Sequence, residues 1–249
     1  MIRKKLTAKK STSSNTTRLN KYIAHAGICS RREADMHISL GVVKVNNKVI
    51  TALGYQVKEG DVVHFDGKRI TPEKKAYVLL NKPKGFITTT RDEKGRKTVM
   101  DLIAKSTPSR VVPVGRLDRP TTGLLLFTND GDLAKKLTHP SSAVKKLYHV
   151  VLSKSLKPHD LAQIRRGLIL DDGPIQVDEI SYVKGMSKRE IGLEIHSGRN
   201  RIVRRIFEHM RYEVIALDRV VFADLTKKDL PRGTWRHLSR QEIDYLNML

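Results

Sequence analysis

The sequence contains a single cysteine, Cys29, among 249 residues. One cysteine excludes an intrachain disulfide and any metal site built on a cysteine pair, and it fits a reducing compartment. No apolar run approaches the ~20 residues that a membrane-spanning helix needs. The N-terminus also lacks the apolar stretch of a secretory signal, so we expect a cytoplasmic protein.

Two common kinds of cofactor site are missing from the sequence as well. The histidines show no recognised metal-ligand spacing, so we expect no metal site. A Gly-rich phosphate loop is also missing. The segment 198–201 is too short and too basic for a dinucleotide fingerprint.

Acidic residues are scarce relative to basic ones. The chain has 48 lysines and arginines against 26 aspartates and glutamates, which gives a formal net charge of +22. A charge of this size attracts polyanions and accelerates encounter with them, although it carries no sequence information and also suits a membrane surface. The composition therefore predicts a polyanionic partner.

Changes of composition divide the chain into four parts. Residues 1–17 carry five lysines or arginines, no acid and a Ser-Thr-Asn tract, which predicts a disordered basic tail. Residues 18–70 have the texture of a small domain, and residues 71–75, with one proline and three charges, predict a linker. Residues 76–249 form the larger domain.

The small domain is predicted to hold two helices followed by short strands. Apolar residues at helical spacing begin at Leu19, and Gly27 is placed to end that helix. Ser30 and Glu33 have the spacing of a capping box, which begins a second helix that runs to Leu40. Strands are predicted at residues 42–45, 49–50 and 62–65.

The larger domain mixes strands with helices. Strands are predicted at residues 77–80, 86–90, 111–114, 124–127, 148–152, 175–183 and 191–196. Helical spacing appears at residues 133–137, 161–168 and 202–210, and a capping box of Ser239 with Glu242 begins a last helix. This order predicts an α+β domain with a mixed or antiparallel sheet and helices packed on it.

The most informative segment is Gly115–Gly131, which places Asp118 between Arg116 and Arg119. The apolar run Leu124–Phe127 predicts a buried strand, with Asp118 on the loop that leads into it. The carboxylate should then lie near the core and face a cleft. For an isolated aspartate in a Gly-rich loop, bracing of a turn would be the simpler interpretation.

Two further segments carry candidate functional side chains. Tyr148 opens a predicted strand after two lysines, where a core or strand-edge tyrosine is the simpler interpretation. In residues 195–207 the apolar positions share one helical face, while Arg201, Arg204 and Arg205 share another with Glu208. A solvated basic face would also explain some of these arginines.

Together these segments resemble the pseudouridine synthases, in the family that includes the small-subunit rRNA synthase A and the large-subunit synthases B, E and F. The resemblance runs from Arg18 to Leu249 and is greatest to the B and F types. Residues 18–50 resemble the S4 RNA-binding module. The implied α+β fold is a small S4-like domain followed by a pseudouridine synthase catalytic domain with a mixed or antiparallel sheet.

The resemblance implies isomerisation of uridine within RNA, by cleavage of the N1 glycosidic bond and reattachment of the same uracil through C5. Such a reaction requires no cofactor. Asp118 would act as a nucleophile at C1′ or as a base at C2′. Tyr148 would pack against the flipped base, and Arg204 would pair with Asp118 through bidentate hydrogen bonds.

The resemblance also implies which residues bind RNA and which RNA is modified. The expected RNA-binding residues are Lys21, Arg31, Arg32, Arg116, Arg119, Arg199, Arg201 and Arg205. The favoured partner is 23S rRNA near the peptidyl-transferase centre, free or in a pre-ribosomal particle, with 16S rRNA or tRNA as alternatives. We expect a monomer. A non-catalytic ribosome-assembly factor is the rival function, but it predicts a broken active site, whereas Asp118, Tyr148 and Arg204 are present.

Overall fold

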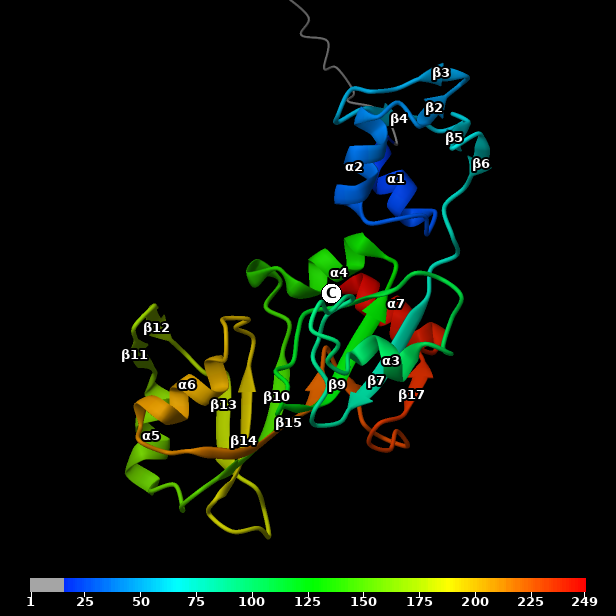
Figure 1. Cartoon of the computed structure of the whole chain (residues 1–249). Coiled ribbons are helices and arrows are strands. Elements are labelled where there is room, and N and C mark those ends of the chain that lie inside the picture. The colour runs from blue at the N-terminus through cyan, green and yellow to red at the C-terminus, as the bar shows by residue number, and fades with distance from the viewer. Residues whose placement is uncertain (1–15) are drawn as a thin grey trace, which may run out of the picture. The chain divides into compact units, whose positions relative to one another are not determined.

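The structure, a computed structural model, describes residues 16–249 and divides into two compact units, which meet in sequence between Lys74 and Lys75 (Figure 1). Residues 1–15 of the predicted basic tail lie outside the described residues. Within residues 16–249, no helix combines the length and the apolar character needed to cross a membrane.

The first unit packs two short helices against small sheets. Helix α1 (Leu19–His25) is followed by α2 (Arg31–Ser39), and the predicted capping box is confirmed by hydrogen bonds between Ser30 and Glu33 in both directions. One sheet has the order β3-β2-β5-β6, and a second sheet pairs β1 with β4. These strands are β1 (Thr17–Arg18), β2 (Val43–Val45), β3 (Lys48–Val49), β4 (Gln56–Val57), β5 (Val63–Phe65) and β6 (Lys68–Ile70).

The second unit is built on a nine-stranded mixed sheet with the main order β13-β14-β10-β15-β9-β7-β17. Its strands are β7 (Tyr77–Lys82), β8 (Val112–Pro113), β9 (Thr122–Thr128), β10 (Lys146–Leu152), β13 (Glu179–Tyr182), β14 (Glu190–Ile195), β15 (Val214–Phe222), β16 (Leu225–Thr226) and β17 (Trp235–His237). A separate hairpin joins β11 (Leu168–Leu170) to β12 (Gly173–Ile175). The predicted α+β class is therefore confirmed.

Helices cover both faces of the sheet at β7 and β9. Leu124 and Leu126 pack with residues of α4 (Gly131–Thr138) and α7 (Arg240–Met248). Leu125 and Phe127 point to the other face and pack with α3 (Val99–Ile103). Burial on both faces explains why this strand is a continuous apolar run rather than an alternating one.

The other end of the sheet has its own core. Helices α5 (Pro158–Arg166) and α6 (Ile202–His209) contribute Ile164 and Phe207 to one cluster, which also contains residues of β10 and β14. Leucine and isoleucine side chains that are fully buried in this cluster fix the position of β10, the strand that carries Tyr148.

The two ends of the sheet are joined by the pairing of β9 with β15. This pairing is parallel and matches Asp218 with Thr122 and Arg219 with Gly123. On its other side β15 pairs antiparallel with β10, where Arg219 is matched with Tyr148. The loop that enters β9 therefore comes close to the middle of β10.

Several predicted elements differ in the structure. Residues 86–90 form no ladder strand and contribute only an isolated bridge between Ile87 and Thr98. The predicted strand 175–183 is divided between β12 and β13, and Leu168 belongs to β11 because Gly167 ends α5 with a φ of 103°. Strand β7 continues to Lys82, two residues beyond the predicted strand 77–80.

Strand β15, a central strand of the sheet, was absent from the predicted elements, as were α3 and β17. Asp218 and Arg219 stand in the middle of β15 and interrupt its apolar pattern. Adjacent charges in a central strand require partners that come from distant segments, and the sequence pattern does not reveal them.

The contact between Gly123 and β15 leaves no space for a side chain. A Cβ atom at Gly123 would lie 2.3 Å from the Arg219 carbonyl oxygen, and its φ of 108° also disfavours other residues. We expect Gly123→Ala to lower the free energy of unfolding by roughly 2 to 4 kcal/mol. Urea denaturation followed by circular dichroism measures this loss.

Gly192→Ala on β14 is the matched control, because a Cβ there meets its nearest atom at 3.7 Å. Its unfolding free energy should change by less than about 1 kcal/mol. Equal losses in the two variants would contradict the close packing of β9 on β15.

Candidate active site

Asp118 lies on the loop before β9, and a buried lysine holds the main chain of that loop through hydrogen bonds. The side chain of Lys82, at the end of β7, is fully buried. Its Nζ donates to the carbonyl oxygens of Asp118 (3.1 Å), Thr121 (2.8 Å) and Pro83 (3.2 Å). Burial lowers the pKa of Lys82 to about 8, and the Asp118 carboxylate opposes this shift. Lys82 therefore fixes the main chain at Asp118 without neutralising the carboxylate through a direct ion pair.

Thr88 also holds the main chain of this loop. Its Oγ1 donates to the Leu117 carbonyl oxygen (2.7 Å) and accepts a hydrogen bond from the Leu117 amide (3.2 Å). The segment predicted as strand 86–90 thus acts as a brace for the Asp118 loop. A threonine hydroxyl that satisfies distant main-chain groups leaves no pattern in the sequence.

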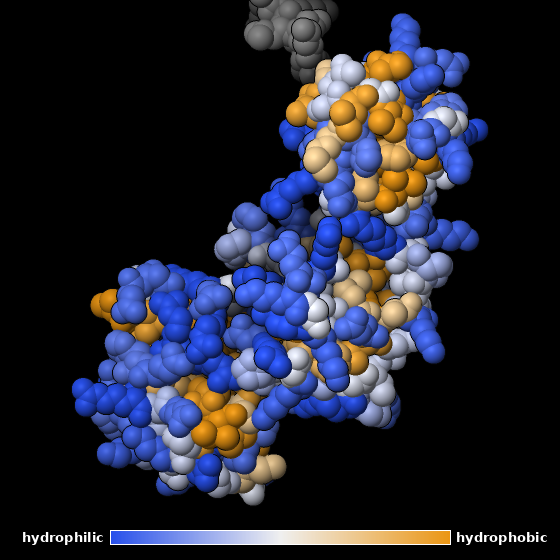
Figure 2. Space-filling view, viewed as in Figure 1, coloured by the Kyte–Doolittle hydropathy of each residue, from blue (hydrophilic) through white to orange (hydrophobic). Residues whose placement is uncertain are grey.

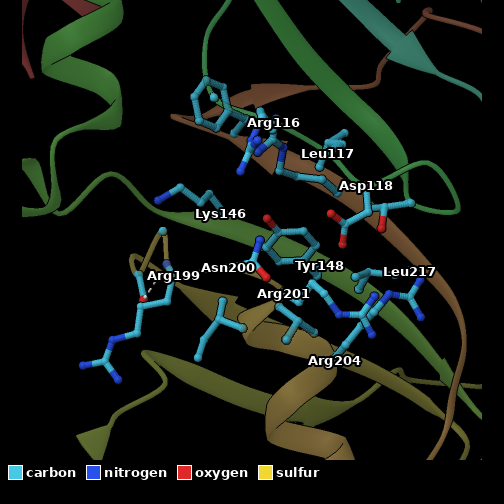
Figure 3. Close-up of a pocket in the computed structure, with 18 of the residues that line it drawn as sticks. Arg116, Leu117, Asp118, Lys146, Tyr148, Arg199, Asn200, Arg201, Arg204 and Leu217 are labelled. Atoms are coloured by element: carbon cyan, nitrogen blue, oxygen red, sulfur yellow. Dashed lines mark hydrogen bonds between the residues drawn. The ribbon is translucent and has the colours of Figure 1, made fainter. Parts of the chain in front are cut away.

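The Asp118 loop, β10, β15 and the start of α6 surround a cavity of about 270 Å³. Asp118, Tyr148 and Arg204, which are distant in the sequence, all line it (Figure 3). Its apolar walls include Leu117, Leu137 and Phe222. The structure therefore brings the three predicted catalytic residues together.

The reactive groups of Asp118 and Tyr148 are not engaged by the protein. Both residues are half-buried, and neither the Asp118 carboxylate nor the Tyr148 hydroxyl has a hydrogen-bond partner among residues 16–249. Figure 3 shows both side chains turned toward the same cavity. A carboxylate and an aromatic ring are thus available to a ligand that enters from solvent.

Arg204 is buried at the start of α6 and interacts with Asp118 electrostatically. Its Nη1 donates to the Val214 carbonyl oxygen (2.9 Å), and its Nε has no partner among the described residues. Burial lowers the pKa of Arg204, Arg201 adds to this, and the Asp118 carboxylate opposes it. The predicted bidentate pair is not formed, because Val214 rather than Asp118 accepts the guanidinium hydrogen bond.

Comparison with protein families identifies the second unit. Residues 76–209 match the family model described as RNA pseudouridylate synthase, and residues 17–63 match the S4 domain. The chain belongs to the RNA pseudouridylate synthase family. Its members are isomerases, so the chain is an enzyme of that class, and the cavity around Asp118 is the candidate active site of this synthase.

Sequence similarity to individual relatives extends over nearly the whole length of this synthase. The chain is 44% identical over 236 residues to the ribosomal large subunit pseudouridine synthase B of Bacillus subtilis, covering 93% of this chain and 96% of the relative. An uncharacterized RNA pseudouridine synthase of Aquifex aeolicus is 39% identical, covering 92% and 93%. A crystal structure of a pseudouridylate synthase superposes with a TM-score of 0.66 at 27% identity, covering 92% of this chain and 99% of that chain.

Exposed arginines surround the entrance of the cavity. Arg116, Arg199 and Arg201, all predicted to bind RNA, line the cavity and remain exposed to solvent. Arg201 takes a left-handed conformation with a φ of 49° before α6, which is uncommon for a residue with a side chain. Figure 2 shows that hydrophilic residues cover most of the visible face of the synthase unit.

Two of the predicted RNA-binding arginines of the synthase unit lie outside the cavity lining. Arg119 donates from Nε to the Gly85 carbonyl oxygen (3.3 Å), and Arg205 forms a bidentate pair with Asp172 (2.7 and 2.8 Å). In the first unit, Arg31 and Arg32 are exposed in the first turn of α2, and Lys21 lies on α1. The spacing of cations in the sequence did not distinguish these positions from the cavity-lining ones.

Lys146 and Arg219 line the cavity of the synthase but were absent from the predicted site. Lys146 Nζ donates to the carbonyl oxygens of Val144 (2.8 Å) and His196 (2.6 Å), so it connects β10 to the loop before α6. Burial, with a further contribution from Arg219, lowers the pKa of Lys146 to about 8. Lys146 stands two residues before Tyr148, so the two side chains share one face of the strand. This spacing is the sequence pattern from which Lys146 could have been predicted to line the site.

The hydrogen bonds of Lys82 make its removal costly. Lys82→Met removes the side-chain donor of the buried Thr121 carbonyl oxygen and one of the two donors of the Asp118 carbonyl oxygen, which the Thr121 amide also serves. An unpaired buried acceptor costs ~1–3 kcal/mol. We expect the free energy of unfolding, measured by urea denaturation, to fall by roughly 2 to 4 kcal/mol.

Lys84→Met is the matched control, because the same substitution is made at an exposed position two residues away. Its unfolding free energy should stay within about 0.5 kcal/mol of the wild-type value. A Lys82→Met protein as stable as this control would show that the loop does not depend on the lysine.

Proposed function

We propose that this synthase converts uridine to pseudouridine in ribosomal RNA, at a site of 23S rRNA near the peptidyl-transferase centre, with Asp118 as the catalytic carboxylate. The observation that carries the proposal is the Asp118 carboxylate beside the Tyr148 side chain in one cavity, with neither the carboxylate nor the tyrosine hydroxyl hydrogen-bonded among residues 16–249. The name of the Bacillus subtilis relative, ribosomal large subunit pseudouridine synthase B, supports the choice of RNA.

The geometry supports a reaction on a base that has left its stack. An extruded uridine loses its neighbouring bases and regains a stacking partner on the Tyr148 ring. Asp118 then acts on the ribose side, as a nucleophile at C1′ or as a base at C2′. The buried Arg204 guanidinium lies close enough to the Asp118 carboxylate for the two charges to interact through space.

The exposed arginines have a different task from the buried groups. Arg116, Arg199 and Arg201 at the cavity entrance meet the phosphates around the flipped nucleotide, where a solvated cation contributes affinity rather than chemistry. Arg119 and Arg205 contribute to the wider basic surface. The net charge of +22 draws the RNA toward this surface.

The first unit supplies a separate RNA contact. Residues 18–70 act as the S4-like RNA-binding domain through Lys21, Arg31 and Arg32, residues 71–75 act as the linker, and residues 76–249 carry the chemistry. The protein works as a monomer on rRNA or on a pre-ribosomal particle. Two arginines in the first turn of α2 oppose the helix dipole, which supports a role in binding an anion rather than in stabilising the helix.

The role of Asp118 is tested by one change. Asp118→Asn keeps the size of the side chain but removes its charge, so we expect pseudouridine formation in a 23S rRNA transcript to be lost. Affinity for the same transcript, measured by filter binding, should stay within about threefold, because phosphate contacts dominate binding. A fully active Asp118→Asn protein would exclude the carboxylate from the reaction.

The target is tested in cells with and without the gene. Carbodiimide adducts stop reverse transcriptase at pseudouridine, so the stops map each modified position. We expect one stop in 23S rRNA to disappear and to return when the wild-type gene, but not the Asp118→Asn gene, is restored. Loss of a stop in 16S rRNA or tRNA instead would move the substrate to that RNA, and unchanged RNA would favour the non-catalytic assembly factor.

A further inference from the structure

Arg219 is a buried cation whose hydrogen-bonding capacity the protein hardly uses. Its side chain is on β15, and the residue is 3% exposed. Nε donates to the Leu124 carbonyl oxygen (2.8 Å), and the guanidinium carbon lies 4.6 Å from the centre of the Phe222 ring. No other hydrogen bond or ion pair involves this side chain among residues 16–249, and Nη2 is buried without any partner.

Such a group is costly unless a ligand completes it. A guanidinium has five N–H donors, and a buried donor without an acceptor is unfavourable by ~1–3 kcal/mol. Arg219 lines the candidate active site, and so do two other groups with unpartnered buried atoms, Arg204 Nε and Thr121 Oγ1. The interior of the cavity therefore presents donors that a ligand rich in oxygen acceptors would satisfy.

The register of the sheet places Arg219 next to Tyr148, the residue proposed to stack on the flipped base. Arg219 is the direct partner of Tyr148 in the antiparallel pairing of β10 with β15, so the two side chains emerge side by side on one face. In the proposed function, the exposed arginines that line the cavity bind the phosphates. A cation beside the stacking ring faces the uracil carbonyl groups instead.

We propose that Arg219 is a catalytic residue, which donates a hydrogen bond to a carbonyl oxygen of uracil and stabilises the negative charge that the ring carries once its bond to ribose is broken. This inference rests on the proposed function.

The charge arises from the chemistry of the isomerisation itself. When the N1–C1′ bond breaks, its electron pair stays on uracil and is shared by N1, O2 and O4. The C5–C1′ bond then forms, C5 loses its proton and N1 gains one, so no other reactant is needed. A preorganised cation in a cavity partly shielded from water is most effective at the point where this charge is largest.

The electrostatic partners of the other cations in the cavity support separate roles for Arg204 and Arg219. Arg204 and Asp118 act on each other electrostatically, which assigns Arg204 to the ribose side of the reaction. Arg219 acts instead on Lys146, whose ammonium is held by carbonyl oxygens of Val144 and His196. Two neighbouring cations, Arg219 buried and Lys146 half-buried, form no ion pair with a carboxylate among the described residues and suit an anion that exists only during the reaction.

The experiment compares two leaving groups in one RNA. Single-turnover cleavage of the glycosidic bond is measured for a target uridine and for 5-fluorouridine at the same position, as loss of the original nucleoside from a nuclease digest. Fluorine stabilises the uracil anion and reduces its need for the protein cation. We expect Arg219→Met to slow cleavage about 100-fold with uridine and several-fold less with 5-fluorouridine, while affinity for the RNA is unchanged.

Two further variants separate this role from a structural one. Arg219→Lys keeps the charge and should recover part of the rate with uridine. Arg201→Met, at the entrance, should weaken RNA binding and leave the ratio between the two substrates unchanged. If Arg219→Met unfolds in a thermal melt, the cleavage rates with uridine and 5-fluorouridine are measured instead for Arg219→Gln, which keeps a donor but no charge.

The outcomes also separate a failure of the proposed function from a failure of the role of Arg219. A wild-type protein that leaves uridine intact in every RNA tested overturns the proposed function, and this inference with it. An active wild type whose Arg219 variants lose the same factor with both nucleosides, or lose only RNA affinity, overturns the role of Arg219 alone.

Discussion

Strands β9 and β15 pair in parallel over a short stretch, and the candidate active site depends on this contact. The pairing matches Gly123 with Arg219, and Arg219 is in turn matched with Tyr148 on β10. Because Gly123 has no side chain, β9 approaches β15 closely, and the loop that carries Asp118 reaches the strand that carries Tyr148. The two ends of the sheet have separate hydrophobic cores, so this junction is where groups from both ends meet.

Cations are held around the site in an unusual way. Lys82, Lys146, Arg204 and Arg219 all donate to main-chain carbonyl oxygens rather than to carboxylates. Carbonyl oxygens fix the position of a cation without cancelling its charge, so the field acts on Asp118 and on whatever enters the cavity. Acidic side chains paired with these cations would cancel much of that field.

The opposite face of β15 shows the contrasting arrangement. Asp218 alternates with Arg219 along the strand and points away from the site. Burial alone would raise the pKa of Asp218, but hydrogen bonds from Arg232, Lys227 and Thr122 hold it at about 2. This cluster of one carboxylate and two cations ties the segment after β16 to the centre of the sheet. One face of the strand thus uses charge for structure, and the other leaves charge available to a ligand.

The sequence alone determined three features: the α+β class, the family, and the position of Asp118 on a loop before a buried strand. Each depends on local patterns of apolar residues and turns. The sequence also pointed to Tyr148 and Arg204. It did not reveal β15, nor the roles of Lys82 and Arg219. A buried cation is stable only where carbonyl groups from distant segments converge on it, as the carbonyl oxygens of Asp118 and Thr121 do on Lys82. Such convergence exists only in the folded chain, and it also decided that Arg116 lines the cavity while Arg119 does not.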